Sequence, residues 1–515
     1  MFINISLTVS AAGAALQDAE AIILVFIAAF VAAAWLLQRA RHGRRSLLPP
    51  GPWHIPLVGS SQLFTASSHI EVTKLGKIYG KAFTLHIGSD PLIVLNDYAI
   101  IKEALVQHAD VFSDRFTFKT MERTIKLKGS LIFENGPAWK ARRRVTLTAL
   151  HHPGGDRSNL ERSVNEEANC LCREFAQQDG QPFDPASIVM TAVSNVICSV
   201  SYGRRFSYDD PAFKRVLANL DSVLHCSFVG SVLRTLPVIS RIPGLDGIRR
   251  ALDEVFDFNR KMVQEHKASF NPDNIRDVID AMLKAGQKDN ERGTDSIDSA
   301  FTDELIARSI YDLFAAGTDT NTNTLLWALL LMTQYPDVQA KVHDEIDSVI
   351  GSRRPSMGDS ASMPYTTATV MEVQRYRVAA PFVPPRRTNQ SVNVGGVWIP
   401  KGTQIWVNLW AVLHDPSLWA GPECFDPARF LADDGQRVIV PEAFIPFGAG
   451  RRICVGKHLS NITNFLCFTN LMQKFAASWP QEGGREADLQ GNLGLTLAPK
   501  RFKIRARSRR SSDCY

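Results

Sequence analysis

The strongest chemical signal in the sequence is a cysteine inside a loop that is rich in glycine. Cys454 lies between Gly448 and Gly456, directly before a stretch with helical periodicity. Glycines allow a backbone to lie flat against a planar ring, and they leave amide groups free to point at a sulfur. A thiolate at a helix start is stabilised by those amides and by the helix dipole. We therefore expect Cys454 to ligate a metal in a planar ring, with Phe447 shielding the sulfur and Arg452 meeting an anionic group of the ring.

Haem fits this description, because thiolate ligation of its iron pushes electron density towards bound oxygen and favours O–O cleavage. The alternative for a lone cysteine is a small buried hydrophobic residue, and we expect that role for the other seven of the eight cysteines. The cysteines show no regular spacing and no CxxC pair. We therefore expect no disulfide framework, and a reducing compartment around the bulk of the chain.

A second group of residues with chemical potential lies in a long apolar run, residues 303–332, which predicts a helix in the middle of a core. Ala316 and Thr320 are four apart and share one face of this helix. Ala316 and Gly317 are small enough to leave room for dioxygen, and Thr320 can donate a hydrogen bond there. Asp319 is placed to pass protons inward from solvent. The alternative for a threonine in a helix is a core residue whose hydroxyl bonds to the preceding turn.

Charged and aromatic residues at helical spacing form a third group. Glu372 and Arg375 are three apart on one face of a predicted helix, and Arg429 follows them in the chain. Trp139 and Arg143 are four apart on another predicted helix. An isolated Glu/Arg pair is usually a solvated surface pair that contributes little to stability, so this group gains meaning only together with the other two.

These motifs resemble those of the cytochrome P-450 family. Residues 447–456 match the haem-binding loop FxxGxRxCxG at every position, and residues 316–320 match the oxygen-activating motif AGxDT. With the proline-rich segment that begins at residue 49, the matches span nearly the whole chain. The resemblance implies a mainly α fold with small β-sheets, in a single large domain. It also implies a haem b cofactor whose iron has Cys454 as its axial thiolate ligand.

The resemblance assigns roles to the remaining motif residues. Residues that bind haem, in addition to Phe447, Gly448, Arg452, Cys454 and Gly456, are expected to be Trp139, Arg143 and Arg386. The residues that form a buried charged triad bracing the haem loop are expected to be Glu372, Arg375 and Arg429. The residues expected to act in catalysis are Ala316, Gly317, Asp319 and Thr320.

The implied activity is a monooxygenase that inserts one oxygen atom from O2 into a lipophilic small molecule. Residues 136–150 and 276–282 resemble the animal microsomal branch of the family, which oxidises steroids, fatty acids and xenobiotics. Two alternatives stay open. A haem-thiolate isomerase or dehydratase would need no reductase, although family members that only rearrange peroxides tend to depart from the motif that is intact at residues 316–320. A catalytically silent haem-binding sensor is the other alternative, although every motif that it could have lost is present.

The substrate pocket is expected between the helix that carries Thr320 and loops that vary in the family. Its candidate lining residues are apolar, which indicates a lipophilic substrate, and core packing is the alternative role for each of them. They are Phe116, Phe118, Phe314, Ala315, Phe382, Val383 and Leu495.

The electrons for such a reaction must come from another protein, because no nucleotide-binding glycine-rich turn follows a predicted strand. The resemblance implies a membrane-bound NADPH-dependent flavoprotein reductase, the NADPH-cytochrome reductase. A net charge of +6 without long Lys/Arg runs argues against a nucleic-acid partner. The basic residues expected to form the reductase-docking face, or alternatively a solvated charge cluster, are Lys140, Arg142, Arg144, Arg451 and Lys457.

The amino terminus carries an uncharged apolar run, residues 21–37, which as a helix would be about 26 Å long. This length suits the thin bilayer of the endoplasmic reticulum. Four arginines between residues 39 and 45 follow the run and none precedes it, so we expect the N-terminus in the lumen and the catalytic body in the cytosol. The alternatives are a cleaved signal peptide, which would need its positive charge before the run, and a buried core helix.

The chain is thus divided into a lumenal tail (1–20), a single-pass transmembrane anchor (21–38), a basic and proline-rich hinge (39–53), a haem-thiolate domain (54–504) and a frayed polar tail (505–515). Within the domain, residues 83–96 predict a β-hairpin, and residues 386–408 predict short strands. An apolar stretch at residues 228–245 either dips into the membrane and admits substrate from the lipid, or is an ordinary buried loop.

Overall fold

The apolar run that begins at Asp303 forms the central helix of the molecule, α12 (Asp303–Gln334). The hydroxyl of Thr302 accepts a hydrogen bond from the Leu305 amide and caps the first turn, and acidic residues at 303 and 304 complement the helix dipole there. The helix ends before Pro336, whose ring disfavours helical geometry in the preceding residue. Most of its residues are buried around the whole circumference, as the sequence predicts for a core helix.

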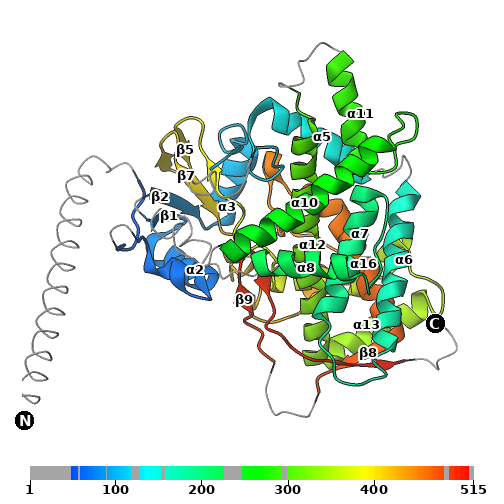
Figure 1. Cartoon of the computed structure of the whole chain (residues 1–515). Coiled ribbons are helices and arrows are strands. Elements are labelled where there is room, and N and C mark those ends of the chain that lie inside the picture. The colour runs from blue at the N-terminus through cyan, green and yellow to red at the C-terminus, as the bar shows by residue number, and fades with distance from the viewer. Residues whose placement is uncertain are drawn as a thin grey trace, which may run out of the picture.

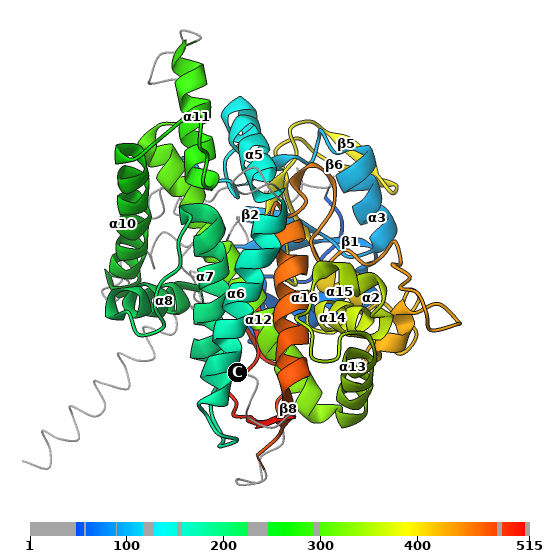
Figure 2. The same cartoon turned by 90° about the vertical axis from the view of Figure 1, so that its right-hand side faces the viewer.

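The computed structural model describes residues 48–55, 58–88, 90–116, 128–151, 157–224, 246–291, 299–480 and 487–509. Within them α12 packs against α7, α10 and α16, and α16 packs in turn against α6 (Figures 1 and 2). Besides α12, the α-helices are α2 (Ser68–Tyr79), α3 (Tyr98–Lys102), α5 (Gly136–His151), α6 (Arg157–Ala176), α7 (Ala186–Tyr202), α8 (Pro211–Leu224), α10 (Asp246–Ala268), α11 (Val278–Glu291), α13 (Pro336–Val349), α14 (Pro364–Tyr376), α15 (Leu409–Leu413) and α16 (Lys457–Lys474). Shorter helical turns are η1 (Ser61–Phe64), η2 (Glu103–Gln107), η5 (Met357–Ala361), η6 (Pro427–Phe430) and η7 (Gly450–Arg452).

Small sheets lie beside the helices. The largest described sheet has five strands in the order β1-β2-β7-β4-β3, and in Figure 1 it lies on the side of the molecule near α2 and α3. Its strands are β1 (Ala82–Ile87), β2 (Asp90–Leu95), β3 (Asp114–Arg115), β4 (Arg386–Arg387) and β7 (Gln404–Val407). Three two-stranded sheets consist of β5 (Val392–Val394) with β6 (Val397–Ile399), β8 (Phe475–Ser478) with β11 (Arg505–Ser508), and β9 (Asn492–Leu493) with β10 (Leu497–Ala498). The predicted hairpin and the predicted short strands are therefore confirmed.

One large hydrophobic core joins the helices to the five-stranded sheet, and its buried residues run from Ala82 to Ala506. A smaller core lies between α2, β1 and β2, with Trp406 of β7 also among its buried residues. Phe382 packs against both cores. The continuous burial across the chain confirms the expected fold class, a single mainly helical domain with small sheets.

The proline-rich stop after residue 48 lies along the first strand. The Pro49 and Pro50 carbonyls accept hydrogen bonds from the Thr84 hydroxyl (2.7 Å) and the Thr84 amide (2.9 Å). A Cβ on Gly51 would lie 1.9 Å from the Thr84 carbonyl oxygen, so only glycine allows this approach. The end of the predicted hinge is therefore part of the folded body.

The predicted anchor, residues 21–38, and the apolar stretch at residues 228–245 lie outside the described residues. Within the part of the chain that the structure describes, no helix combines the length and apolar character needed to cross a bilayer.

The C-terminal segment differs from the prediction of a frayed tail from residue 505. Strand β11 pairs antiparallel with β8, with Arg505 opposite Ser478 and Ser508 opposite Phe475. The Arg509 amide donates to the Lys474 carbonyl (2.9 Å), and its guanidinium donates to Asp347 (2.6 Å). The folded domain thus continues to residue 509, because the polar side chains of β11 face outward while its backbone completes a ladder.

We predict that a chain ending at Ile504 is less stable than the full chain, because it loses the β8–β11 ladder. Backbone hydrogen bonds contribute about 0.5–1.5 kcal/mol each, so we expect the apparent Tm to fall by about 5 °C. A chain ending at Arg509 is the matched control, and it should melt with the full-length protein. Equal melting of both truncated chains would mean that β11 contributes nothing to the fold.

Candidate active site

The loop that carries Cys454 is shaped by glycines and by its own backbone hydrogen bonds. The Cys454 amide donates to the Phe447 carbonyl (3.0 Å), which closes the loop that contains η7 and precedes α16. Gly448 and Gly450 both have φ of 71°, a region that favours glycine. A Cβ on Gly450 would lie 1.9 Å from the Leu105 carbonyl oxygen of η2. The glycines therefore serve both a tight loop and its close packing on η2.

The Cys454 thiol experiences opposing electrostatic influences. Desolvation by the surrounding protein raises its pKa, whereas hydrogen bonds from the Gly456 and Lys457 amides and the charges of Arg143 and Lys457 lower it, and the pKa is raised on balance. The residue nevertheless has an exposed surface. Both observations hold if the thiol faces a space inside the molecule.

One face of α12, which carries Ala316 and Thr320, is not fully covered by other side chains although the helix is central. We call it the bare face of α12. Ala316 is exposed and Thr320 is half-buried, while Ala315 and Thr318 are buried. The Thr320 hydroxyl donates to the Ala316 carbonyl (2.8 Å), so the two residues share one face as predicted. Asn321, the next residue, accepts hydrogen bonds from α16.

These hydrogen bonds bring the two motifs close together. Asn321 Oδ1 accepts from the Ser460 hydroxyl (2.6 Å) and from the Asn464 amide (3.1 Å). Ser460 lies in the first turns of α16, shortly after Cys454. These bonds hold α12 against the start of α16, and we infer that the bare face of α12 and the Cys454 loop border the same internal space.

Two other residues of the α12 motif point elsewhere. A Cβ on Gly317 would lie 2.7 Å from the Ile197 Cδ1 atom of α7, so the glycine allows these two helices to pack closely. The Asp319 carboxylate accepts hydrogen bonds from Asn323 (3.0 Å) and from the Thr496 hydroxyl (2.6 Å). Asp319 is therefore buried against the loop before β10.

Four arginines gather around the Cys454 loop. Burial lowers the pKa of Arg115, Arg143, Arg386 and Arg452, to about 10 for Arg386 and about 9 for Arg452, and the charges of the other three arginines lower the pKa of Arg115 further. Within the described residues, none of the four forms an ion pair with a carboxylate, although the charge of Asp114 raises the pKa of Arg452.

Hydrogen bonds hold these arginines in place. Arg143 donates to the Ile453 carbonyl (2.5 Å), and Arg386 donates to the Phe112 carbonyl (3.1 Å). Arg452 donates to the Ser113 carbonyl (2.8 Å) and the Glu134 carbonyl (2.7 Å), and its guanidinium stacks 3.3 Å from the centre of the Trp139 ring. The buried Nε of Arg386 and Nη1 of Arg452 have no hydrogen-bond partner among the residues that the structure describes. The cluster thus has unsatisfied donors and excess positive charge, which fit an anionic ligand.

Arg115 was not predicted from the sequence. It donates from Nε to the Ile132 carbonyl (3.0 Å) and from Nη1 to the Pro384 carbonyl. It pairs with Arg386 across β3 and β4. A two-residue strand carries no periodic signal, and the convergence of Arg115 with three distant arginines depends on long-range pairing.

The predicted charged triad is present as a buried ion-pair network. Arg375 donates to both oxygens of Glu372 (2.7 and 2.9 Å), and Arg429 Nε donates to Glu372 Oε1 (3.0 Å). Glu372 and Arg375 are fully buried. The Nη1 and Nη2 groups of Arg375 also donate to the carbonyls of Leu413 (2.7 Å) and Pro422 (2.9 Å). The triad therefore ties α14 to the long segment that leads to η6.

The structure places the predicted pocket residues in different environments. Val383 lies at the site, with Cγ1 3.7 Å from the Cβ position of Gly448, and its neighbour Phe382 contacts the Trp406 ring (5.3 Å). Phe116 is half-buried and its amide donates to the Pro385 carbonyl (3.2 Å). Leu495 is 53% exposed on the loop that holds Asp319.

Other predicted pocket residues belong to the core or are not described. Phe314 is fully buried among Tyr202 and Phe258 (6.2 and 6.1 Å between ring centres), and Ala315 is buried beside it. These two residues face the packed helices instead of the bare face of α12. Phe118 lies outside the described residues.

One residue of the predicted reductase-docking face does not lie on the surface. Arg142 is fully buried, ion-paired with Glu134 and hydrogen-bonded to the Ala300 carbonyl (2.7 Å), because it shares the buried face of α5 with Trp139. The others are exposed, and of these Arg451 pairs with Asp110. The exposed members are Lys140, Arg144, Arg451 and Lys457.

Comparisons with known proteins agree with this geometry. The family model described as cytochrome P450 matches residues 49–506. Cytochrome P450 2U1 of Homo sapiens is 38% identical over 513 residues, covering 94% of this chain and 93% of the relative. Cytochrome P450 2J2 of Homo sapiens is 38% identical over 490 residues (94% and 95%), and cytochrome P450 2D6 of Homo sapiens is 37% identical over 499 residues (93% and 98%). The chain therefore belongs to the cytochrome P450 monooxygenase family.

Proposed function

We propose that the protein inserts one oxygen atom from O2 into a lipophilic small molecule, with electrons derived from NADPH. The observation that carries this proposal is the exposure of Cys454 and Ala316 on elements that hydrogen bonds hold together in the core, from which we infer a shared internal space. This arrangement brings a soft metal ligand and a hydroxyl to the same space inside a hydrophobic core.

The residues around this space fit haem. A thiolate ligand from Cys454, a glycine-rich loop and four arginines that form no ion pair with a carboxylate of the described residues match an iron porphyrin with two propionates. When bound, the haem-thiolate group activates dioxygen. Cys454 would ligate the iron, and Arg115, Arg143, Arg386 and Arg452, the last stacked on Trp139, would hold the propionates.

Thr320 and Asp319 have different roles in proton transfer. The Thr320 hydroxyl, which donates to the Ala316 carbonyl in the structure, can rotate and donate into the internal space. Asp319 holds the Thr496 hydroxyl at 2.6 Å, beside the exposed Leu495. A proton entering from solvent at this loop can thus reach Asp319 through Thr496, one residue from Thr320.

The substrate is proposed to be lipophilic, such as a steroid, a fatty acid or a xenobiotic. Val383 and Phe382 supply apolar surface beside the Cys454 loop. Burial of apolar ligand surface against such walls drives binding, and the Thr320 hydroxyl is a polar group at the bare face of α12.

We propose that residues 21–38 anchor the protein in the endoplasmic reticulum membrane as a single pass, with residues 1–20 in the lumen and the haem-thiolate domain in the cytosol. The partner is then the membrane-bound NADPH-cytochrome reductase. Exposed cations on α5 and at the start of α16, Lys140, Arg144 and Lys457, lie on the elements that flank the Cys454 loop. Their charge favours docking of an acidic partner close to the iron ligand.

The alternative activities make different demands on these residues. An isomerase or dehydratase would take no electrons from NADPH, and a sensor would form no product. The intact motif at residues 316–320 and the Asp319–Thr496 contact are dispensable for both alternatives, so the role of Thr320 separates the three functions.

The first prediction from this proposal concerns the iron ligand. Cys454→Ser should abolish the long-wavelength Soret band of the reduced, carbon monoxide-bound protein, because that band depends on thiolate donation. Turnover should be lost with it. The matched control is Cys424→Ser, since Cys424 is an exposed cysteine away from the loop, and it should keep both properties. Retention of the band in Cys454→Ser would disprove the ligand assignment.

A second prediction tests Thr320. With a lipophilic compound chosen by its spectral shift, Thr320→Ala should keep substrate affinity and the carbon monoxide spectrum. Product formation should fall by about 10²–10⁴-fold, the usual contribution of a positioned proton donor, while NADPH oxidation continues and hydrogen peroxide accumulates.

The controls for this experiment are on the same helix. Thr320→Ser should restore most of the product, because it keeps the hydroxyl. Thr324→Ala should change little, although the Thr324 hydroxyl makes the same kind of contact, donating to the Thr320 carbonyl (2.8 Å). An unchanged ratio of product to NADPH in Thr320→Ala would mean that Thr320 is a packing residue.

A third prediction concerns Arg115. Loss of one charged hydrogen bond to a propionate costs about 1.5–3 kcal/mol, so Arg115→Gln should release haem roughly 10–100-fold faster. Transfer of haem to excess apomyoglobin measures this rate. Arg387→Gln is the control, because Arg387 is the exposed neighbour of Arg386 on β4. Equal rates for both variants would remove Arg115 from the propionate site.

A further inference from the structure

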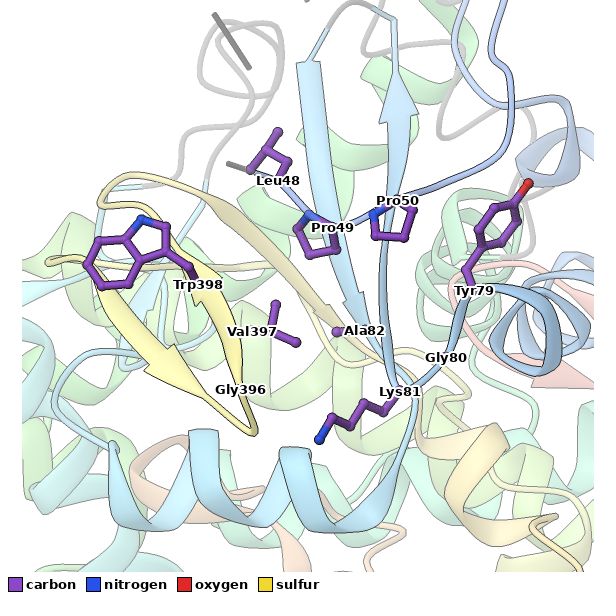
Figure 3. Close-up of a pocket in the computed structure, with 10 residues that line it drawn as sticks. All are labelled: Leu48, Pro49, Pro50, Tyr79, Gly80, Lys81, Ala82, Gly396, Val397 and Trp398. Carbon is purple, nitrogen blue, oxygen red and sulfur yellow. The ribbon is translucent and has the colours of Figure 1, made fainter. Parts of the chain in front are cut away.

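A surface pocket of about 450 Å³ lies where the chain enters the folded body. Its walls come from the proline-rich segment, the end of α2, the start of β1 and the β5–β6 turn. The residues that line it are Leu48, Pro49, Pro50, Tyr79, Gly80, Lys81, Ala82, Gly396, Val397 and Trp398. Figure 3 shows Trp398 and Tyr79 on opposite sides of the pocket and the Lys81 side chain extending towards the turn at Gly396.

The pocket combines apolar walls with one cation. Trp398 is 45% exposed although it is large and apolar, and Trp53 in the segment that follows the prolines is 65% exposed. Lys81 is exposed, and its Nζ lies 3.2 Å from the Cβ position of Gly395. Such a combination recognises an amphipathic anion, which has an acidic head and a hydrocarbon body.

The charge of Lys81 is not neutralised by the described part of the chain, where it forms no ion pair with a carboxylate. Glu103 reaches the same turn, but one of its oxygens accepts from the Gly395 amide (3.1 Å) and the other lies 3.9 Å from His108. An anionic ligand would therefore meet a cation that no carboxylate of the described residues contacts directly.

The position of the pocket indicates where this ligand comes from. Only residues 38–47 separate Leu48, in the pocket wall, from the apolar run at residues 21–37. When fully extended, this segment spans at most about 36 Å. Those residues include Arg39, Arg41, Arg44 and Arg45, and such a cluster attracts anionic lipids. If the apolar run crosses a bilayer, the pocket stays within reach of its headgroups.

We propose that this pocket binds the headgroup of an anionic phospholipid taken from the bilayer in which the chain is anchored. The phosphate and the acidic headgroup lie against Lys81, and the glycerol and first acyl carbons lie against Trp398, Tyr79 and Leu48. Tryptophan and tyrosine suit this position, because their rings favour the boundary between hydrocarbon and water. The bound lipid connects the hinge to the β5–β6 turn and fixes how the body sits on the membrane. This inference rests on the proposed membrane location.

The test measures which lipids the full-length protein retains. The protein is assembled in nanodiscs of phosphatidylcholine with a minor fraction of phosphatidylserine, released with mild detergent and analysed by native mass spectrometry. We expect the wild type to retain phosphatidylserine above its share in the membrane. Lys81→Gln should reduce this retention about fivefold, because one lysine near a lipid surface contributes ~1 kcal/mol.

Lys401→Gln is the matched control, since Lys401 is an exposed lysine just after β6, and it should retain phosphatidylserine like the wild type. An equal loss of phosphatidylserine in both variants would mean that surface charge in general attracts the lipid, and it would overturn the proposal. An absence of phosphatidylserine enrichment in the wild type would overturn it as well. Both variants should keep the carbon monoxide spectrum and the melting temperature of the wild type.

Two further measurements separate the pocket from the membrane location. Failure of the protein to float with vesicles would refute the anchor. Short-chain phosphatidylserine, kept below its micelle concentration, tests the pocket without any membrane. It should change the fluorescence of the wild type but not that of Trp398→Phe, and an identical response of the two proteins would refute the pocket.

Discussion

Four guanidinium groups buried beside Cys454 repel one another, and no carboxylate of the described residues forms an ion pair with them. Burial of unpaired charge is costly, so the folded chain is electrostatically incomplete in this region. An anion that fills the space stabilises the positions of β3, β4, α5 and the Cys454 loop at once, because each of them contributes one arginine. Cofactor binding and local folding are in this sense a single equilibrium.

The charged triad differs from the arginine cluster, because its charges pair with one another. Glu372 lies between Arg375 and Arg429, and the donors left over reach backbone carbonyls. Because this network is satisfied internally, it needs no ligand and can hold the segment before the Cys454 loop in place when the cofactor is absent. Removal of Glu372 alone would leave two buried cations without a partner, which is more destabilising than the loss of a surface ion pair.

The sequence predicts best what depends on local spacing. The central helix, the hairpin, the shared face of Ala316 and Thr320 and the Glu372–Arg375 pair all follow from periods of two or of about four residues. The same reasoning fails where the outcome depends on distant partners. Arg142 looks like a surface cation until Glu134 and the Ala300 carbonyl are known to cover it.

The remaining differences have the same origin. Residues 505–509 are mostly polar, yet they are ordered because β8 offers an open edge. Phe314 lies only two residues before Ala316, but this step turns its side chain away from the bare face and into the aromatic core. A motif therefore locates a site along the chain with precision, while the neighbours of that site must be determined from the structure.

The loop before β10 connects the motif on α12 to other parts of the fold. Thr496 donates to Asp319, Asn323 donates to Thr496 (3.0 Å), and the Trp327 indole donates to the Leu497 carbonyl (2.9 Å). Three residues of α12 spaced four apart thus fasten one loop along a single helix face. The same loop presents Leu495 to solvent and reaches the Leu224 carbonyl at the end of α8. A displacement of Leu495 therefore also moves the hydroxyl that donates to Asp319, because Thr496 connects the exposed part of this loop to the motif on α12.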